Sequence, residues 1–309
     1  MIFNNIATQG IMSKKTITIT SIIIVLIVVI ASAYFFYFNP QVCPVGYVEF
    51  DGALSRVCVA KYEMRKGANG QAVSQPQGLP WTMVKLKEAI AACQKNGDRY
   101  DLISNEIWTL VARDIASVPE NWSSGAEYVG RLNVGHANKS PNAPLAASTN
   151  DQDACFGLTE KCSQSVWSFF RRTHVLPNNV VIWDFSGNVA EWIKDTSPLL
   201  NTDNHVAFSL VKFNNPPFSR FGPTTNCDNP ELSNMFCGFG AFKNAKVAHK
   251  NGICRGGHWE QGSPDVSGVF ATAINLNIWD RDKHLGFRCV YRPLEGITSV
   301  RDLITRLRN

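Results

Sequence analysis

The sequence lacks the short motifs by which many enzymes are recognised. It contains no Gly-x-Ser-x-Gly nucleophile elbow and no His-Glu-x-x-His zinc motif. Its nine cysteines include no Cys-x-x-Cys pair, which argues against a structural zinc site. No two histidines lie three or four residues apart among His136, His174, His205, His249, His258 and His284. These absences exclude the common hydrolase signatures and a two-histidine metal site on one helix.

The chain also has little excess charge. Its formal net charge is +5 over 309 residues, and 18% of the residues are charged. Nucleic-acid binding depends on a strong basic patch, so we expect no nucleic-acid partner. Because 45% of the residues are hydrophobic, the chain has enough apolar material for a full core.

Charge is absent from residues 16–38, which are almost continuously apolar. About 20 apolar residues match the hydrocarbon thickness of a bilayer. Lys14 and Lys15 precede this run, and no charge follows it until Glu49. The positive-inside rule therefore leaves residues 1–15 in the cytoplasm. We predict a single-pass transmembrane helix over residues 16–38, with the remaining chain in the periplasm or at the cell surface.

A cleaved signal peptide is the alternative, because Ala31-Ser32-Ala33 has the pattern of a cleavage site. The apolar run continues for five residues beyond that site, which favours an uncleaved anchor. All nine cysteines follow the run, and either interpretation exports them to a compartment that permits disulfides. Because nine is odd, at least one cysteine has no partner within the chain.

After the apolar run, the pattern predicts few regular elements. Strand-like residues on both sides of Asp51-Gly52 predict a hairpin over residues 47–50 and 56–64, closed by Cys43 and Cys58. Helical periodicity is predicted over residues 82–95 and 105–115, the second with Ser104 as N-cap.

The rest of the exported part is predicted to be mainly loop. Further strands are expected at 180–183, 253–259 and 286–291, and a short amphipathic helix at 297–307. Residues 66–80, 118–170 and 199–250 are expected to be irregular, and loops of that length need ties such as disulfides or bound ions. No internal repeat is visible. These elements predict an α+β domain.

Six short motifs follow one another along this part of the chain. They are Lys61-Tyr62-Glu63, residues 89–93, Glu106-Ile107-Trp108 with Ala112-Arg113, residues 183–192 (WDFSGNVAEW), Arg255-Gly256-Gly257-His258-Trp259 and Gly286-Phe287-Arg288-Cys289. Their order and spacing resemble the formylglycine-generating-enzyme, or sulfatase-modifying factor, domain family. The resemblance implies a variant of the C-type lectin-like fold, with two helices, short antiparallel strands and long loops.

This resemblance also sets the expected domain limits. It covers about residues 43–293, so we assign the domain to residues 39–293 and an amphipathic tail to residues 294–309. The detailed sequence of these motifs is similar to that of a bacterial branch of the family, which includes target proteins of diversity-generating retroelements. In that branch the ligand-binding surface lies between the Arg-Gly-Gly and Gly-Phe-Arg motifs.

The family resemblance implies a disulfide between Cys93 and Cys289. Local bridges are then expected between Cys155 and Cys162 and between Cys227 and Cys237, which leaves Cys254 buried beside the Arg-Gly-Gly turn. Gly256 and Gly257 are expected to make a sharp turn. Trp259 and Phe287 are expected in the core, and Arg288 in an ion pair with a carboxylate.

The family also places a structural calcium ion in the stretch from Asp184 to Glu191. Carried over by position, the ligands would be the carboxylates of Asp184 and Glu191 and the carbonyls of Phe185, Gly187 and Val189. Hard oxygen donors of this kind suit calcium. The alternative is that the two carboxylates cap turns and pair with arginines or backbone amides.

Catalysis is not expected. The oxidases of this family bind copper through two cysteines before the Gly-Phe-Arg motif, but residues 257–286 contain none. The iron-dependent relatives need histidines on an added domain that this sequence lacks. We therefore expect neither copper nor iron, and no nucleotide. The enzymatic alternative is a diverged activity in the same cleft, for example with Cys254 as nucleophile beside His258.

Binding is the preferred interpretation. Large and chemically mixed side chains lie between the last two motifs, and the dense charge of residues 280–284 excludes most of them from a core. Trp279 beside Arg281 is the kind of anchor that interfaces favour, whereas a solvated loop is the alternative. The candidate ligand-binding residues are His258, Glu260, Gln261, Thr272, Asn275, Asn277, Trp279, Asp280, Arg281, Asp282, Lys283 and His284. We predict a membrane-anchored, non-catalytic domain that binds an extracellular or periplasmic protein or glycan. A structural envelope component is a further alternative.

Overall fold

The computed structural model describes residues 43–52, 55–197, 218–225, 227, 235–243, 251–261 and 263–293. Within these residues, no helix is long and apolar enough to cross a bilayer. The transmembrane helix predicted over residues 16–38 and the tail helix predicted over residues 297–307 lie outside the described residues.

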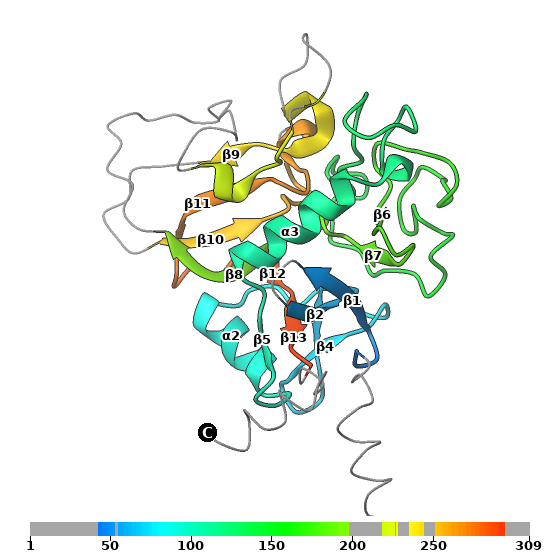
Figure 1. Ribbon diagram of the computed structural model, residues 1–309. Helices are drawn as coiled ribbons and strands as arrows, with labels where there is room; N and C mark the ends of the chain where they lie inside the picture. The colour runs from blue at the N-terminus through cyan, green and yellow to red at the C-terminus, as the bar shows by residue number, and fades with distance from the viewer. Residues whose placement is uncertain are drawn as a thin grey trace, which may run out of the picture. The chain divides into compact units, whose positions relative to one another are not determined.

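A four-stranded antiparallel sheet joins the two ends of the domain. Its strand order is β1 (Tyr47–Gly52), β2 (Ser55–Ala60), β13 (Cys289–Tyr291) and β5 (Tyr100–Leu102). The predicted hairpin is present as β1 and β2, with Tyr47 opposite Ala60. The turn predicted at Asp51-Gly52 is misplaced, because these two residues extend β1 and pair with Arg56 and Ser55. Pairing of β13 with both β2 and β5 places the end of the domain beside its beginning (Figure 1).

A five-stranded sheet carries the candidate site. Its order is β12 (Leu285–Phe287), β8 (Ala190–Ser197), β10 (Asn251–Arg255), β11 (Thr272–Asn277) and β9 (Phe242–Lys243). The strand predicted over residues 286–291 is in fact two strands. Only Arg288 separates β12 from β13, and the chain changes sheets there.

Strand β11 was not predicted, because residues 272–277 were interpreted only as part of a binding segment. The observed strand pairs antiparallel with β10, with Thr272 opposite Arg255. The alternation of side chains that marks a strand is hard to recognise in this sequence. Thr272 is buried like Ile274 although it is polar, and Asn275 and Asn277 on the other face are only half-buried.

Both predicted helices are present. Helix α3 (Asn105–Ala116) begins as predicted, with the Ile107 amide donating to Ser104 Oγ. Helix α2 (Leu86–Gln94) is shorter than the predicted 82–95. Met83 has a φ of 59°, which no α-helix accommodates, and the Lys85 amide donates to the Glu88 carboxylate at the new start.

Two further hairpins lie outside the main sheets. Strand β3 (Met64–Lys66) pairs with β4 (Ala72–Ser74), so the segment 66–80 is not wholly a loop as predicted, and the strand predicted over residues 56–64 ends at Ala60. Strand β6 (Thr173–Val175) pairs with β7 (Val181–Trp183). Short helical turns lie at Pro119–Asn121, Phe218–Phe221, Met235–Phe239 and Pro264–Val266.

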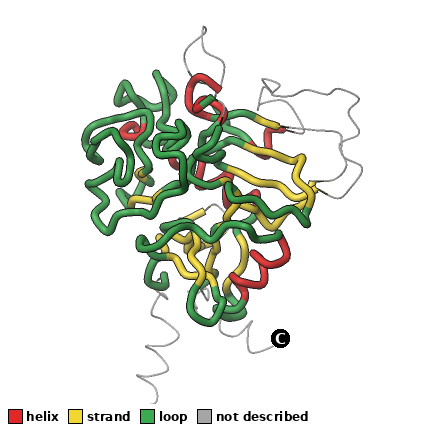
Figure 2. Tube along the Cα trace, turned by 180° about the vertical axis from the view of Figure 1, so that it is seen from behind, coloured by secondary structure: helices red, strands yellow, loops and turns green. Residues whose placement is uncertain are grey.

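Helix α3 packs on one face of the five-stranded sheet and supplies the centre of the core. Trp108 stacks on Phe185 with ring centroids 4.0 Å apart, and its indole donates to the Val269 carbonyl. Trp259 and Phe287 are buried as predicted, at 2% and 1% exposure. Among the described residues, two main sheets, two α-helices and long loops therefore form an α+β fold, as predicted (Figures 1 and 2).

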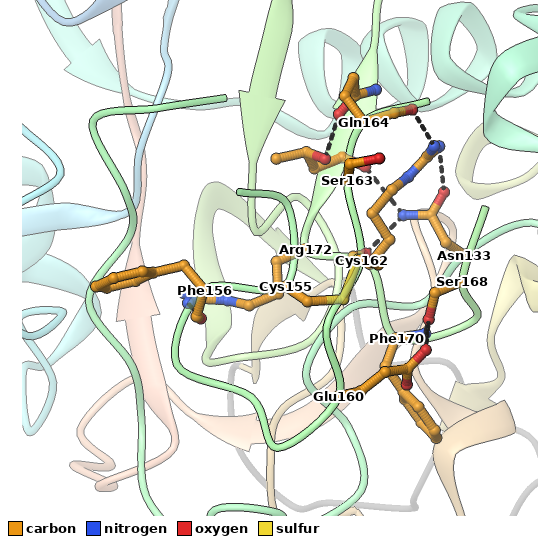
Figure 3. Close-up of a disulfide and its surroundings, with 12 residues drawn as sticks. Asn133, Cys155, Phe156, Glu160, Cys162, Ser163, Gln164, Ser168, Phe170 and Arg172 are labelled. Carbon is orange, nitrogen blue, oxygen red and sulfur yellow. Dashed lines mark hydrogen bonds between the residues drawn. A yellow bond between two sulfur atoms is a disulfide. The ribbon is translucent and has the colours of Figure 1, made fainter. Parts of the chain in front are cut away.

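The long loop predicted over residues 118–170 is held by polar ties, as loops of this length require. The Cys155–Cys162 disulfide closes one part of it, and the Ser168 hydroxyl donates to the Glu160 carboxylate nearby (Figure 3). Arg172 is fully buried and donates to the Phe156 carbonyl at 2.6 Å. These contacts fix the loop without regular secondary structure.

The structure contains the four disulfides that were expected. They join Cys43 to Cys58, Cys93 to Cys289, Cys155 to Cys162 and Cys227 to Cys237. Cys254 is the free cysteine, and it is buried. Four disulfides are typical of a domain outside the cytoplasm.

Candidate functional site

The Arg-Gly-Gly turn brings the segment 257–261 over the five-stranded sheet. Gly256 and Gly257 have φ values of 87° and 80°, the left-handed region that favours glycine. A Cβ at Gly257 would lie 2.7 Å from Ser267 Cα, so no side chain fits there. The chain therefore leaves β10 abruptly, and His258 and Gln261 lie against the sheet instead of continuing it.

The sheet face away from α3 forms the floor of the site. Cys254 on β10 lies opposite Trp192 on β8 and Ala273 on β11, and Ala273 lies opposite Lys243 on β9. Paired residues share one face of a sheet, so these side chains form a row across it. Their neighbours Ile253 and Ile274 point the other way, into the core around α3.

Small side chains leave a cavity of about 220 Å³ on this face. We call it the sheet cavity. Its floor includes Ala190, Cys254 and Ala273, and residues 257–261 and 282–285 border it. Six of the predicted ligand-binding residues line it, namely His258, Gln261, Thr272, Asn275, Asp282 and His284.

His284 forms one border of the sheet cavity through a network of charged groups. Its two ring nitrogens contact the carboxylates of Asp282 and Glu260. Lys283 also pairs with Glu260, at 3.0 Å, and lowers the pKa of that carboxyl together with His284. Partial burial opposes ionisation of Asp282, but its bonds to His284 outweigh this and lower its pKa. The ionisable groups on this side are therefore already in contact with one another.

His258 faces the sheet cavity as a neutral group. Burial lowers its pKa to about 4, and the nearby His284 acts in the same direction. The Glu260 amide donates to His258 Nδ1, so the ring proton resides on Nε2. The His258 and His284 rings lie 4.5 Å apart.

Two carboxamides on the cavity lining have unused hydrogen-bonding capacity. Asn275 Oδ1 is buried and has no hydrogen-bond partner. Among the described residues, the Gln261 side chain also makes no hydrogen bond. A buried acceptor without a donor costs free energy, so the cavity is prepared for a polar guest.

The remaining candidates lie on the turn next to the cavity, not in it. Trp279 is 61% exposed, and Lys85 Nζ lies 5.5 Å from its ring. Asn277 and Asp280 stabilise the turn through bonds to backbone amides, and Arg281 pairs with Glu88 on α2. We call residues 277–281 the exposed turn. Prediction from sequence missed Lys243, Ala190 and Ala241 on the lining, because small or isolated residues in separate strands carry no motif.

Cys254 lies on the cavity floor, but its environment does not activate it. Burial raises the pKa of its thiol to about 12, although Lys243 and Arg255 act in the opposite direction. The other eight cysteines are paired in disulfides, so no second thiol is present to form the oxidase pair.

We expect Cys254 to react with iodoacetamide at pH 8 about a thousandfold more slowly than an exposed cysteine, because only the thiolate is nucleophilic. The rate should rise about tenfold per pH unit, since pH 8 lies far below the pKa of about 12. Mass spectrometry of the alkylated chain measures this, with the guanidinium-unfolded chain as control. Fast reaction at pH 7 would contradict the raised pKa and favour a nucleophilic role.

The predicted calcium ligands Asp184 and Glu191 are both in ion pairs. Both oxygens of Asp184 accept from Arg172, at 2.8 and 2.6 Å, and Glu191 accepts from Arg288, at 2.7 Å. All four side chains are buried. This arrangement corresponds to the ion-pair alternative, because arginines already occupy both carboxylates.

The other proposed calcium ligands are carbonyls of the same turn. Asp184, Gly187 and Asn188 have positive φ values there, and the Gly187 amide donates to the Gly256 carbonyl. The turn thus also supports the Arg-Gly-Gly segment. Among the described residues, no group of three histidine, cysteine or acidic side chains could hold a metal. Calcium at this turn stays an untested prediction.

The fold places the chain in the C-type lectin-like class. The chain belongs to the sulfatase-modifying factor enzyme 1-like domain family, whose model matches residues 14–293. The family resemblance drawn from the sequence motifs is thereby confirmed. A comparison with curated proteins gives no significant match.

Several solved structures are similar to the chain. Treponema denticola variable protein 1 is 17% identical, with a TM-score of 0.38, over 77% of this chain and 85% of that one. PvdO from Pseudomonas aeruginosa is 16% identical, with a TM-score of 0.35, over 82% and 90%. The Major Tropism Determinant U1 variant is 12% identical, with a TM-score of 0.42, over 84% and 55%. At these identities and scores, the similarities carry no conclusion about function.

Proposed function

We propose that this protein is a non-catalytic ligand-binding module, anchored by a transmembrane helix over residues 16–38 and exposed in the periplasm or at the cell surface. The observation that carries the proposal is the sheet cavity, whose polar lining groups include a buried acceptor without a donor. The ligand would place one group in the cavity and contact the exposed turn beside it.

The lining itself supports binding over catalysis. A catalytic base or nucleophile needs a pKa matched to its task. Here His258 is neutral with its pKa lowered to about 4, and the Cys254 thiol has its pKa raised to about 12. Neither group is poised to exchange a proton near neutral pH. Hydrogen bonding to a guest is what the lining offers.

The exposed turn adds contact area outside the cavity. Trp279 combines a large, exposed ring with the neighbouring charges of Lys85 and Arg281. Exposed tryptophan and arginine are typical of the anchors at binding interfaces. Because the cavity holds only about 220 Å³, contacts on this turn would supply much of the affinity for a larger ligand.

Filling the cavity should weaken binding strongly. In Ala273→Leu, three added carbon atoms on the cavity floor would take up the space of the guest, so we expect affinity to fall at least tenfold. The full chain would be tested on an array of surface glycans and envelope proteins, beside Trp279→Ala and the remote control Gln94→Ala. Thermal unfolding of each variant verifies that it remains folded.

The two site variants separate the parts of the site. Loss of a specific hit in Ala273→Leu, with the hit retained in Gln94→Ala, supports the sheet cavity. Loss in Trp279→Ala alone would move the site to the exposed turn. A hit retained by both variants would contradict the proposed site.

A further inference from the structure

The geometry points to a chemical class for the guest of the sheet cavity: a secondary amide with a small apolar substituent, the acetamido group of an N-acetylated sugar. This inference rests on the proposed ligand-binding function and deepens it. It follows from which lining groups are already paired, which are not, and how they are distributed around the cavity.

Charge is the first property of the lining that determines which guest it can bind. The ionisable groups at the border already contact one another, since His284 contacts Asp282 and Glu260, and Glu260 also pairs with Lys283. Lys243, the other charged residue on the lining, is not without a partner either. The groups left over are neutral, namely the carboxamides of Asn275 and Gln261 and the Nε2–H of His258. A charged guest would lose its hydration without gaining a free counter-charge, so a neutral polar guest is favoured.

Direction is the second selection. A secondary amide donates through N–H on one side and accepts through C=O on the other. The acceptor Asn275 Oδ1 belongs to β11 on the floor, whereas His258 and Gln261 belong to the segment 257–261 that borders the cavity. Two separate elements can therefore serve the two sides of one amide once the Asn275 carboxamide turns its oxygen toward the guest. A single hydroxyl would leave part of this capacity unused.

Size and apolar surface are the third selection. The cavity of about 220 Å³ is smaller than the roughly 300–1,000 Å³ of pockets that enclose a whole drug-sized ligand, so it suits one substituent of a larger molecule. Ala241, Ala271 and Leu285 on its lining offer apolar contact to a methyl group. A sugar ring would then remain at the mouth, within reach of the border residues.

Cys254 supplies a readout on the cavity floor that is independent of affinity methods. N-acetylglucosamine at millimolar concentration is expected to slow the alkylation of Cys254 in the full chain at pH 9 several-fold, whereas glucose and glucosamine do not. Titration followed by NMR or calorimetry gives the affinities. Asn275→Ala and Gln261→Ala should each weaken binding about five- to tenfold, because each removes one hydrogen bond, and Gln94→Ala should not.

The outcomes distinguish this inference from the proposed function. Equal protection of Cys254 by glucose or glucosamine would overturn the acetamido assignment and leave the ligand-binding function standing. The same holds if the array identifies a ligand that has no acetamido group and that Ala273→Leu no longer binds. The assignment would also be overturned if Asn275→Ala and Gln261→Ala both bind N-acetylglucosamine as well as the unchanged chain does. Absence of any protection by N-acetylglucosamine would also contradict it. Because the two variants lie on different elements, misfolding of one leaves the other as the test.

Discussion

Replacing Arg288 with alanine is expected to lower the free energy of unfolding by about 3–5 kcal/mol, because it leaves a buried carboxylate without its partner. Arg288 is fully buried and donates to Glu191 at 2.7 Å and to the carbonyls of Ala60 and Trp183 at 2.8 and 3.0 Å. It is also the one residue between β12 and β13, so its guanidinium joins the two sheets where the chain passes between them.

Glu191 gives this prediction a pH signature. Burial raises the pKa of its carboxyl, although Arg288 favours the ionised form. Without Arg288 the pKa should rise further, and the carboxyl can then relieve its isolation by binding a proton. A carboxyl whose pKa is raised in the folded state stabilises it at low pH and loses that contribution as pH rises. The deficit of Arg288→Ala should therefore be larger at pH 8 than at pH 5.

Urea unfolding of both proteins at the two pH values measures these differences. Arg281→Ala is the matched control, because its ion pair with Glu88 is about half exposed and should contribute less than 1 kcal/mol. A double replacement, Arg288→Met with Glu191→Leu, should recover part of the loss. Equal and small effects in Arg288→Ala and Arg281→Ala would contradict the role assigned to Arg288.

Local sequence signals predicted the local structure well. Ser104 identified the start of α3, because an N-cap acts within three residues, and the strand-like residues around Asp51-Gly52 identified the first hairpin, although the turn itself follows Gly52. The Gly256-Gly257 turn was predicted for the same reason. In each case the residues that determine the structure are neighbours in the chain, so the pattern alone contains the information.

The candidate site depends on contacts that no local pattern contains. Its floor combines Ala190, Lys243, Cys254 and Ala273 from four strands, and of those strands only β10 was predicted. Arg288 was expected to pair with a carboxylate, but Glu191 lies 97 residues away. What could be predicted was the segment that borders the site; the cavity itself results from the order of strands in the sheet.

Removal of the Cys93–Cys289 disulfide is expected to have the other large effect. The two cysteines lie 196 residues apart, and in the chain-entropy account a loop of this length contributes about 5 kcal/mol to the free energy of unfolding. The bridge joins the end of α2 to β13, the strand that pairs with both β2 and β5. Its loss therefore frees nearly the whole domain in the unfolded state.

The Cys155–Cys162 bridge provides the internal comparison, since it spans only 7 residues and should contribute about 2.5 kcal/mol. The paired replacements Cys93→Ala with Cys289→Ala, and Cys155→Ala with Cys162→Ala, would be compared by urea unfolding under non-reducing conditions. The larger loss should come from the first pair. Similar losses would mean that strain or residual structure, and not loop length, determines the stability that these bridges supply. Cys289 directly follows Arg288, so the loss of the Cys93–Cys289 bridge can be combined with Arg288→Ala in one variant. If the two losses in the free energy of unfolding simply add, the covalent and the ionic connection act independently.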